Sequence, residues 1–236
     1  MAENRESRYR EEMISVVIPT LNASESLDAT IRSLPRALVT EVIISDGGSA
    51  DNTLDLARSH EARIVEGAAG RGGQLARGAA AARGDWLLFL HADTRLDEAA
   101  GQAMDRFMKR HHSKEAAGYF RFSLDDVGAA ARILEWGVSL RCRLFGLPYG
   151  DQGLLVCRAF YDWLGGYRPL PLMEDVDIAR RIGRKRLKRL EADAVTSAER
   201  YRRGGYARRV IRNLSCLCLY LLGVSPDRIK SRYERP

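Results

Sequence analysis

The sequence contains few of the features that mark redox, zinc-binding or membrane-spanning proteins. Only four of its 236 residues are cysteines, and no two of them form a Cys-x-x-Cys pair. No Ser-His-Asp or Cys-His arrangement suggests a covalent nucleophile. The last apolar stretch, VIRNLSCLCLYLLGVSP, is interrupted by Arg212 and Asn213 and falls short of the roughly 20 apolar residues that span a bilayer. Buried thiols are therefore expected at Cys142, Cys157, Cys216 and Cys218.

The first residues, MAENRESRYREEM, are polar and lack the charged, apolar and small-residue regions of a secretory signal. This pattern predicts a cytoplasmic protein, either free or at the inner face of the membrane. The length and a hydrophobic content of 45% predict one large domain with added tails. We divide the chain into a polar tail at residues 1–12, a main domain at residues 13–200, and a basic and apolar helical extension at residues 201–236.

Positive charge is concentrated in one part of the chain. The formal net charge is +7, yet residues 178–212 alone carry thirteen Arg and Lys against three Asp and Glu. A general nucleic-acid binder would spread basic residues among exposed aromatic ones. A basic segment next to an apolar stretch instead favours a phosphate-bearing ligand or an anionic membrane surface.

The first half alternates between strand and helix patterns. Short β-branched or apolar runs at residues 14–18, 41–45, 62–65 and 86–90 predict strands, and helical spacing predicts helices at residues 24–34, 51–59 and 74–83. This alternation is typical of an α/β fold with a largely parallel sheet.

The second half is less regular. Strands are predicted at residues 116–124 and 154–157, helices at residues 127–140 and from Glu174, and a glycine-containing loop at FGLPYGDQG. The apolar stretch at residues 210–224 is expected to be the last element. It either packs on the domain as an ordinary helix or lies at a membrane interface.

Polar residues follow three of the predicted strands. They are Thr20 with Asn22, then Asp46, and then His91 with Asp93 in the run LLFLHADT. Each could be a turn residue or helix cap, as Asp93-Thr94 would be before a helix. Because ligands gather at the carboxyl ends of parallel strands, the three sets together predict a binding site at one edge of the sheet.

Two further segments suggest the chemistry of this site. Asp93 suits Mg²⁺, which takes carboxylate oxygens together with substrate phosphates. The loop GAAGRGG permits close backbone approach and places Arg71 near a base or a phosphate, although it lacks the Lys-Ser/Thr ending of a P-loop. In PLMEDVD, Glu174 and Asp175 begin a helix, and the apolar turn before them would hold one carboxylate in a partly dry cleft as a general base.

Taken together, the blocks VIPTLN, FLHADT, GDQG and LMEDVD resemble those of family 2 glycosyltransferases with the GT-A fold, in particular a small bacterial branch. The resemblance covers residues 14–200. It implies a Rossmann-like sandwich, with a mixed, mostly parallel central sheet flanked by helices, followed here by a C-terminal helical segment. It also implies inverting transfer of a sugar from a nucleoside diphosphate sugar to a hydroxyl, aided by Mg²⁺ or Mn²⁺.

The resemblance also assigns roles to residues. Asp175 would be the catalytic base, with Glu174 beside it, and Asp93 would be the metal ligand. The expected nucleotide-sugar contacts are Pro19, Thr20, Asn22, Asp46, Gly47, Arg71, Gln74, His91, Ala92, Asp93, Asp151 and Gln152. His91 stands where the family usually has the first carboxylate of Asp-x-Asp, and no histidine follows His112 to complete a metal site. This departure predicts either a neutral ribose contact or a weaker metal site.

The donor base is expected to be uridine first and guanosine next, and the apolar C-terminal stretch suggests a lipid-like acceptor. Two other functions stay open. A sugar nucleotidyltransferase shares the α/β architecture but would carry a Gly-rich loop with Arg and Lys after the first strand, where this chain has PTLNASE. A non-catalytic protein that binds a polyanion or a membrane would explain the basic segment but leave the carboxylates without a role.

Overall fold

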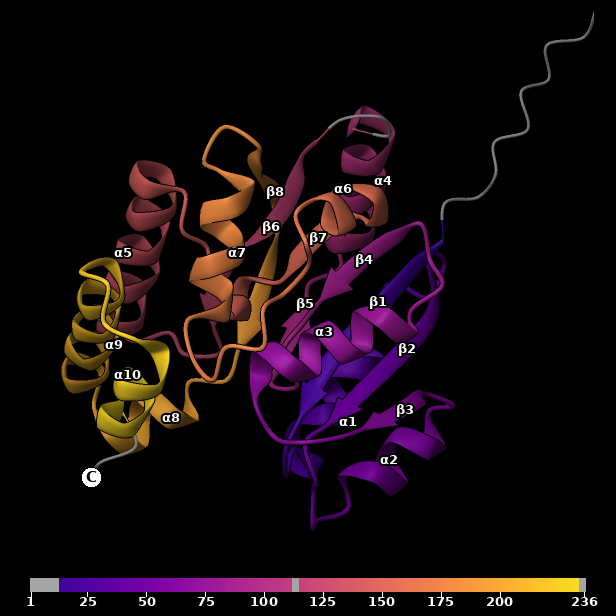
Figure 1. Cartoon of the computed structure of the whole chain (residues 1–236), viewed down its shortest axis with the longest axis horizontal. Helices are drawn as coiled ribbons and strands as arrows, with labels where there is room; N and C mark the ends of the chain where they lie inside the picture. The colour runs from indigo at the N-terminus through magenta and orange to yellow at the C-terminus, as the bar shows by residue number, and fades with distance from the viewer. Residues whose placement is uncertain (1–12, 112–114, 234–236) are drawn as a thin grey trace, which may run out of the picture.

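The computed structural model describes residues 13–111 and 115–233, so the polar tail assigned to residues 1–12 lies outside the described residues. Within these ranges the chain forms an eight-stranded sheet with helices on both faces, in the strand order β3-β2-β1-β4-β7-β6-β8-β5 (Figure 1). The sheet is mixed, as expected for the α/β class.

The first half forms the parallel part of the sheet. Strands β1 (Ile14–Thr20), β2 (Val39–Asp46), β3 (Arg63–Glu66) and β4 (Trp86–Phe89) are joined by helices α1 (Ser24–Arg32), α2 (Thr53–Ser59) and α3 (Arg71–Ala81). The register pairs Thr20 with Asp46 at the carboxyl ends of β1 and β2. This alternation confirms the β-α pattern predicted for residues 14–90.

The second half adds antiparallel pairs. Strand β7 (Leu154–Cys157) runs antiparallel to β4 and β6 (Ala117–Leu124), while β8 (Leu187–Thr196) pairs parallel with β6 and antiparallel with β5 (Thr94–Leu96). The helical elements between these strands are α4 (Ala100–His111), α5 (Ala129–Phe145), the 3₁₀ turn η1 (Gly150–Gln152), α6 (Arg158–Trp163) and α7 (Glu174–Ile182).

Some interpretations of the sequence are wrong, including the expected burial of Cys218, which is exposed, and the alternative role of Asp93 as a helix cap. Asp93-Thr94 caps no helix, because Thr94 begins β5 and its side-chain hydroxyl contacts that of Thr196 at 3.0 Å. The apolar stretch is not the last element either. It forms α9 (Tyr206–Leu221), and α10 (Pro226–Tyr233) follows it. The proposed boundary at residue 200 falls inside α8 (Glu199–Gly204).

The core has two layers because successive side chains of a strand point to opposite faces of the sheet. In β1, Val16 and Ile18 pack with α1 and α4 on one face, while Val17 packs with α3, α5, α7 and α9 on the other. Helix α9 joins this second layer through buried Leu217. The C-terminal extension is thus packed on the main domain.

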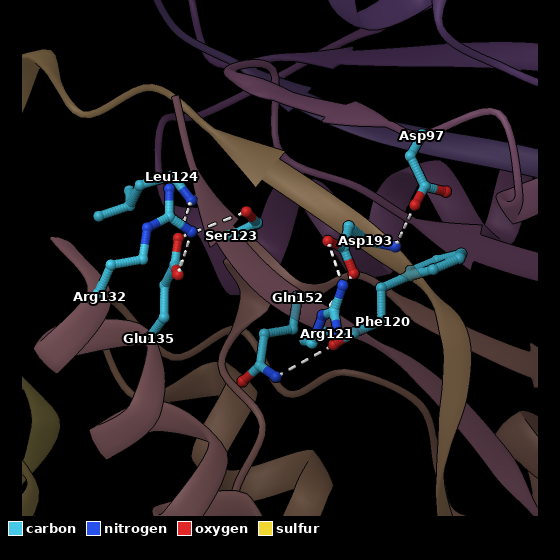
Figure 2. Close-up of polar contacts among 9 residues, drawn as sticks. All are labelled: Asp97, Phe120, Arg121, Ser123, Leu124, Arg132, Glu135, Gln152 and Asp193. Carbon is cyan, nitrogen blue, oxygen red and sulfur yellow. Dashed lines mark hydrogen bonds and ion pairs between the residues drawn. The ribbon is translucent and has the colours of Figure 1, made fainter. Parts of the chain in front are cut away.

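Polar contacts fix α5 and η1 against the sheet (Figure 2). One carboxylate oxygen of Glu135, on α5, accepts a hydrogen bond of 2.8 Å from the main-chain N–H of Leu124, at the end of β6. The buried Gln152 amide donates over 3.1 Å to the carbonyl of Phe120, in the middle of β6. The first contact holds the Glu135 side of α5 against β6, and the second holds η1 against the same strand.

Candidate active site

Two adjoining cavities open at the carboxyl ends of β1, β4 and β8. The outer cavity has a volume of about 680 Å³, and the inner cavity one of about 150 Å³. Their shared wall residues include Arg71, His91, Asp93, Glu174 and Arg200. The combined space is in the range of small-molecule sites.

The outer cavity brings together most of the residues expected to contact a nucleotide. Pro19, Thr20, Asn22, Arg71, Gln74, His91, Ala92 and Asp93 line it. Asn22 adopts a left-handed backbone conformation with φ of 50° and accepts a hydrogen bond of 2.9 Å from the main-chain N–H of Ala50. This contact fixes the loop after β1 against the loop after β2.

Asp46 and Gly47 are not part of the lining of either cavity. The fully buried Asp46 carboxylate accepts hydrogen bonds from the Thr20 hydroxyl at 2.8 Å and the Ser49 hydroxyl at 2.6 Å, and from the main-chain N–H groups of Gly48 and Ser49. These donors hold the pKa of Asp46 below its ordinary value against the opposing effect of burial, which is the largest single influence. Asp46 therefore shapes the wall through Thr20.

Gln74 ties the glycine-rich loop to the sheet. Its side-chain amide donates hydrogen bonds of 2.7 Å to the carbonyl of Thr20 and 2.9 Å to that of Ser45, and its side-chain oxygen accepts one from Gly70. These bonds occupy the side-chain amide of the buried Gln74, so this residue positions the carboxyl ends of β1 and β2.

At the end of β4, His91 and Asp93 face the cavities. His91 Nε2 is buried without a hydrogen-bond partner, and burial, followed by the nearby charges of Arg71 and Arg200, lowers the pKa of His91 well below its usual range. This lowering favours the neutral form of the imidazole. An oxygen of the Asp93 carboxylate lies 3.7 Å from the exposed Arg200 guanidinium, an ion pair that is weak at this exposure.

Glu174 and Asp175 begin α7 and lie in the inner cavity. Glu174 is only 2% exposed, and burial together with the neighbouring Asp175 raises the pKa of Glu174 to about 7 despite Arg71, which lies 3.5 Å away. Asp175 accepts hydrogen bonds from the main-chain N–H groups of Val176 at 2.7 Å and Gly150 at 3.0 Å. The carboxylate pair of LMEDVD is thus held inside the cavity.

The Gly150-Asp151-Gln152 turn faces two ways. Asp151 lines the inner cavity with Oδ1 unpartnered, and burial raises the pKa of Asp151 to about 6, helped by Asp175 and opposed by Arg141. Gln152 lines neither of the two cavities. Its oxygen accepts from the main-chain N–H of Tyr149 at 3.2 Å, which together with the bond to Phe120 makes it a support of the turn.

Several wall residues went unrecognised in the sequence because no local motif singles them out. They come from η1, the end of β8, α8, α9 and α10, and comprise Tyr149, Thr196, Ser197, Arg200, Tyr201, Arg203, Arg209, Asn213, Lys230 and Tyr233. Arg212 lies over the ring of Tyr233, 4.3 Å from its centroid, and so places the end of α10 at the cavity mouth. Part of the basic segment therefore lies at this site.

The sequence was compared with models of known protein families. The model described as "Glycosyl transferase family 2" matches residues 15–143, more than half of the chain. The chain belongs to glycosyltransferase family 2. This confirms the resemblance seen in the sequence motifs and favours a transferase over a nucleotidyltransferase or a non-catalytic protein.

Curated relatives include a "PGL/p-HBAD biosynthesis glycosyltransferase" of Mycobacterium bovis, which is 40% identical over 167 residues, covering 66% of this chain and 63% of the relative. The chain thus spans less than two thirds of that relative's length. A "Validoxylamine A glucosyltransferase" of Streptomyces hygroscopicus is 45% identical over 56 residues, covering 22% of this chain and 13% of the relative.

Solved structures confirm the GT-A fold. Residues 1–349 of the S. aureus protein TarS, in complex with UDP, have a TM-score of 0.59 at 16% identity, covering 80% of this chain and 62% of that TarS chain. Glucosyl-3-phosphoglycerate synthase from Mycobacterium tuberculosis, in complex with Mn²⁺, UDP and glucosyl-3-phosphoglycerate, has a TM-score of 0.55 at 23% identity, covering 86% and 78% of the two chains.

A divalent cation fits the site only with the help of a ligand. Within residues 13–111 and 115–233, no group of three His, Cys, Asp or Glu side chains is arranged to hold a metal. Mg²⁺, however, often uses one or two carboxylates plus substrate phosphates. Asp93, with 21% of its side chain exposed in the cleft, supplies such a carboxylate. His91, whose Nε2 has no hydrogen-bond partner, precedes it by two residues in the sequence.

Proposed function

We propose that this protein is an inverting glycosyltransferase that moves a sugar from a nucleoside diphosphate sugar, with a UDP-sugar favoured, to an acceptor hydroxyl. One observation carries the proposal: the continuous cleft holds Asp93 and Arg71 at the mouth of an inner cavity that contains Asp175. A diphosphate would lie across the mouth, and its sugar would point towards the carboxylates. The UDP complexes of TarS and of the mycobacterial synthase support uridine as the base.

In this mechanism Asp175 takes the proton from the acceptor hydroxyl as the oxygen attacks the anomeric carbon. Its two main-chain donors keep it oriented for that transfer. Attack from the side opposite the departing diphosphate inverts the anomeric centre. Glu174, held at a pKa of about 7, stays close to Arg71 and balances its charge when no diphosphate is bound.

Basic side chains around the outer cavity neutralise the leaving group. Arg71, Arg200, Arg203 and Lys230 line that cavity. A divalent cation held by Asp93 and the donor phosphates would add to this neutralisation. Thr20 and Asn22 would contact the nucleoside, with His91 as a neutral ribose contact. Pro19, Gln74 and Ala92 would complete its pocket, and Asp46, Gly47 and Gln152 would support it.

The test is to mix the protein with UDP- and GDP-sugars in the presence of Mn²⁺ and to measure release of the nucleoside diphosphate. We expect slow release from at least one UDP-sugar, because water replaces the missing acceptor. The variant Asp175→Asn is the matched control. Failure of UDP and GDP alike to bind by calorimetry would overturn the proposal. Stronger binding of GDP than of UDP would leave the proposed reaction in place and change the expected nucleobase from uracil to guanine.

A further inference from the structure

Helices α5 and α9 expose large apolar side chains that are not packed into the core of the domain. Five lie on α5 and three on α9: Ile133, Trp136, Leu140, Leu144, Phe145, Ile211, Leu214 and Leu221. We call these the α5–α9 surface. Trp136 is 68% exposed and Ile133 is 69% exposed, values unusual for such large side chains. An exposed apolar area of this kind marks a binding surface.

The exposed residues recur with helical spacing on each helix. On α5 the positions 133, 136, 140 and 144 fall on one side, while Ala131, Val138 and Cys142 are buried on the other. On α9 the exposed Leu214 and Leu221 share one side of the helix and flank the buried Leu217, which is three and four positions from them. Helix α5 therefore presents one apolar stripe to the core and a second to the outside, whereas the apolar side of α9 continues from the core to the outside.

Helices α5 and α9 are held next to each other. The helices are in contact and lie side by side at the left edge of the molecule (Figure 1). The hydroxyl of Tyr206, at the start of α9, donates a hydrogen bond of 2.8 Å to the carboxylate of Asp126, just before α5. Glu135 fastens α5 to β6 from its inner side (Figure 2).

Charge identifies the partner. Arg143 is exposed beside Leu144 on α5, and Arg208 is exposed near the start of α9, which contains no acidic residue. Exposed apolar side chains, including a Trp, together with exposed arginines on the same helices, are typical of a surface that lies in the headgroup region of an anionic bilayer. A second copy of this chain would bring the same arginines against each other. No helix within the described residues is long and apolar enough to cross a bilayer.

We propose that the α5–α9 surface docks on an anionic lipid membrane. Helix α9 then connects the membrane to the cleft, because its Arg209 and Asn213 line the inner cavity while Leu214 and Leu221 face outwards. A lipid-like acceptor could present its hydroxyl there without leaving the bilayer. This last point rests on the proposed function, whereas docking itself does not.

Tryptophan fluorescence provides a matched test. Of the three tryptophans, Trp86 is buried, and Trp136 and Trp163 are exposed to nearly the same extent, 68% and 65%. Trp163 lies on α6, on the far side of α7 from α5 in the view of Figure 1. The variant Trp163→Phe leaves Trp136 as the exposed reporter, and the variant Trp136→Phe leaves Trp163.

With phosphatidylcholine–phosphatidylglycerol vesicles we expect a blue shift of the emission in Trp163→Phe and none in Trp136→Phe. Phosphatidylcholine vesicles should give a much smaller shift. An equal shift in both variants, or none in either, would overturn the proposal. A shift that grows with protein concentration in the absence of lipid would show that the surface binds a second copy of the chain instead of a membrane.

Sedimentation with the same vesicles tests the charge. Arg143→Gln and Arg208→Gln should each weaken binding to anionic vesicles by about fivefold, and raised salt should do the same. Arg36→Gln, an exposed substitution in the α1–β2 loop, is the control and should leave binding unchanged. Unchanged binding in both test variants would contradict an electrostatic contribution from this surface.

The two proposals fail separately. Release of UDP from a UDP-sugar, measured without vesicles, should be the same in Arg143→Gln as in the unmodified chain. If the protein sediments with anionic vesicles but binds neither UDP nor GDP, docking stands and the proposed reaction falls. If it releases UDP but gives neither sedimentation nor a fluorescence shift, the reaction stands and docking falls.

Discussion

The main-chain N–H of Gly150 donates a hydrogen bond of 3.0 Å to Oδ2 of Asp175. This bond joins the GDQG turn to the first residues of α7, which are 25 positions further along the chain. The Val176 N–H occupies the other carboxylate oxygen at 2.7 Å. The two bonds fix the orientation of the proposed base, so two of the sequence blocks act as one unit.

Replacing Asp175 by Asn should abolish most transfer and leave UDP binding nearly intact. The amide keeps the shape and one acceptor but cannot take a proton, so we expect kcat to fall by about a hundredfold to ten-thousandfold. Turnover and calorimetric binding of UDP with Mn²⁺ check this. Activity equal to that of the unmodified chain would move the base to Glu174 or Asp151.

Much of the parallel half could be predicted because each element carries its own signal. Val16, Val17 and Ile18 are β-branched and buried on both sides, and the following polar residues mark the strand end. Because β1 and β4 run parallel, their carboxyl ends lie at the same edge of the sheet, which brings Thr20, His91 and Asp93 to one place. The local sequence pattern agrees with the fold in this region, so its strands and helices could be predicted from the sequence alone.

The wall formed by β8 and α8 could not be seen in the same way. The strand Leu187–Thr196 alternates buried Leu190, Ala192 and Ala194 with exposed or half-buried charged neighbours, but the surrounding arginines and lysines obscure this period of two. The main-chain N–H of Ser197 then donates over 3.3 Å to the carbonyl of Asp93, a contact between residues 104 positions apart. No local pattern encodes such a pairing.

Replacing Asp93 by Ala should weaken UDP binding chiefly when Mn²⁺ is present. The carboxylate would bridge the metal to the protein, and its exposed partner Arg200 would remain free to contact phosphate without metal. Titrations with Mn²⁺ and with a chelator separate the two cases. Asp105→Ala, a surface change on α4, is the control. A loss of the same size with chelator would mean that Asp93 contacts the nucleotide directly.

Replacing Gly150 by Ala should reduce turnover more than it reduces UDP binding. The added Cβ would overlap Nε2 of the buried His91, so the turn must shift and draw its N–H away from Asp175. A misplacement of this kind can cost about a hundredfold in rate. In Gly73→Ala, a control in α3, the new atom would meet only the Pro169 side chain at 4.0 Å. Unchanged kcat in Gly150→Ala would show that the contact does not position the base.

Replacing Glu174 by Gln should stabilise the protein above pH 7 and not at pH 4.5. The pKa of Glu174 is raised to about 7 from an ordinary 4.5, mainly by burial, so between these values the folded chain holds a proton that the unfolded chain has released. The free energy of unfolding therefore falls as the pH rises through this window, and the full penalty is present above it. Gln carries no charge to bury, and at about 1.4 kcal/mol per pKa unit we expect a gain of about 1 to 3 kcal/mol at pH 8. Urea unfolding of both chains at pH 4.5 and pH 8 measures this, with the 87% exposed Glu191→Gln as the control. A gain of equal size at both pH values would point to improved packing, and a loss at pH 8 would show that the ionised Glu174 is stabilised by Arg71 more than burial destabilises it.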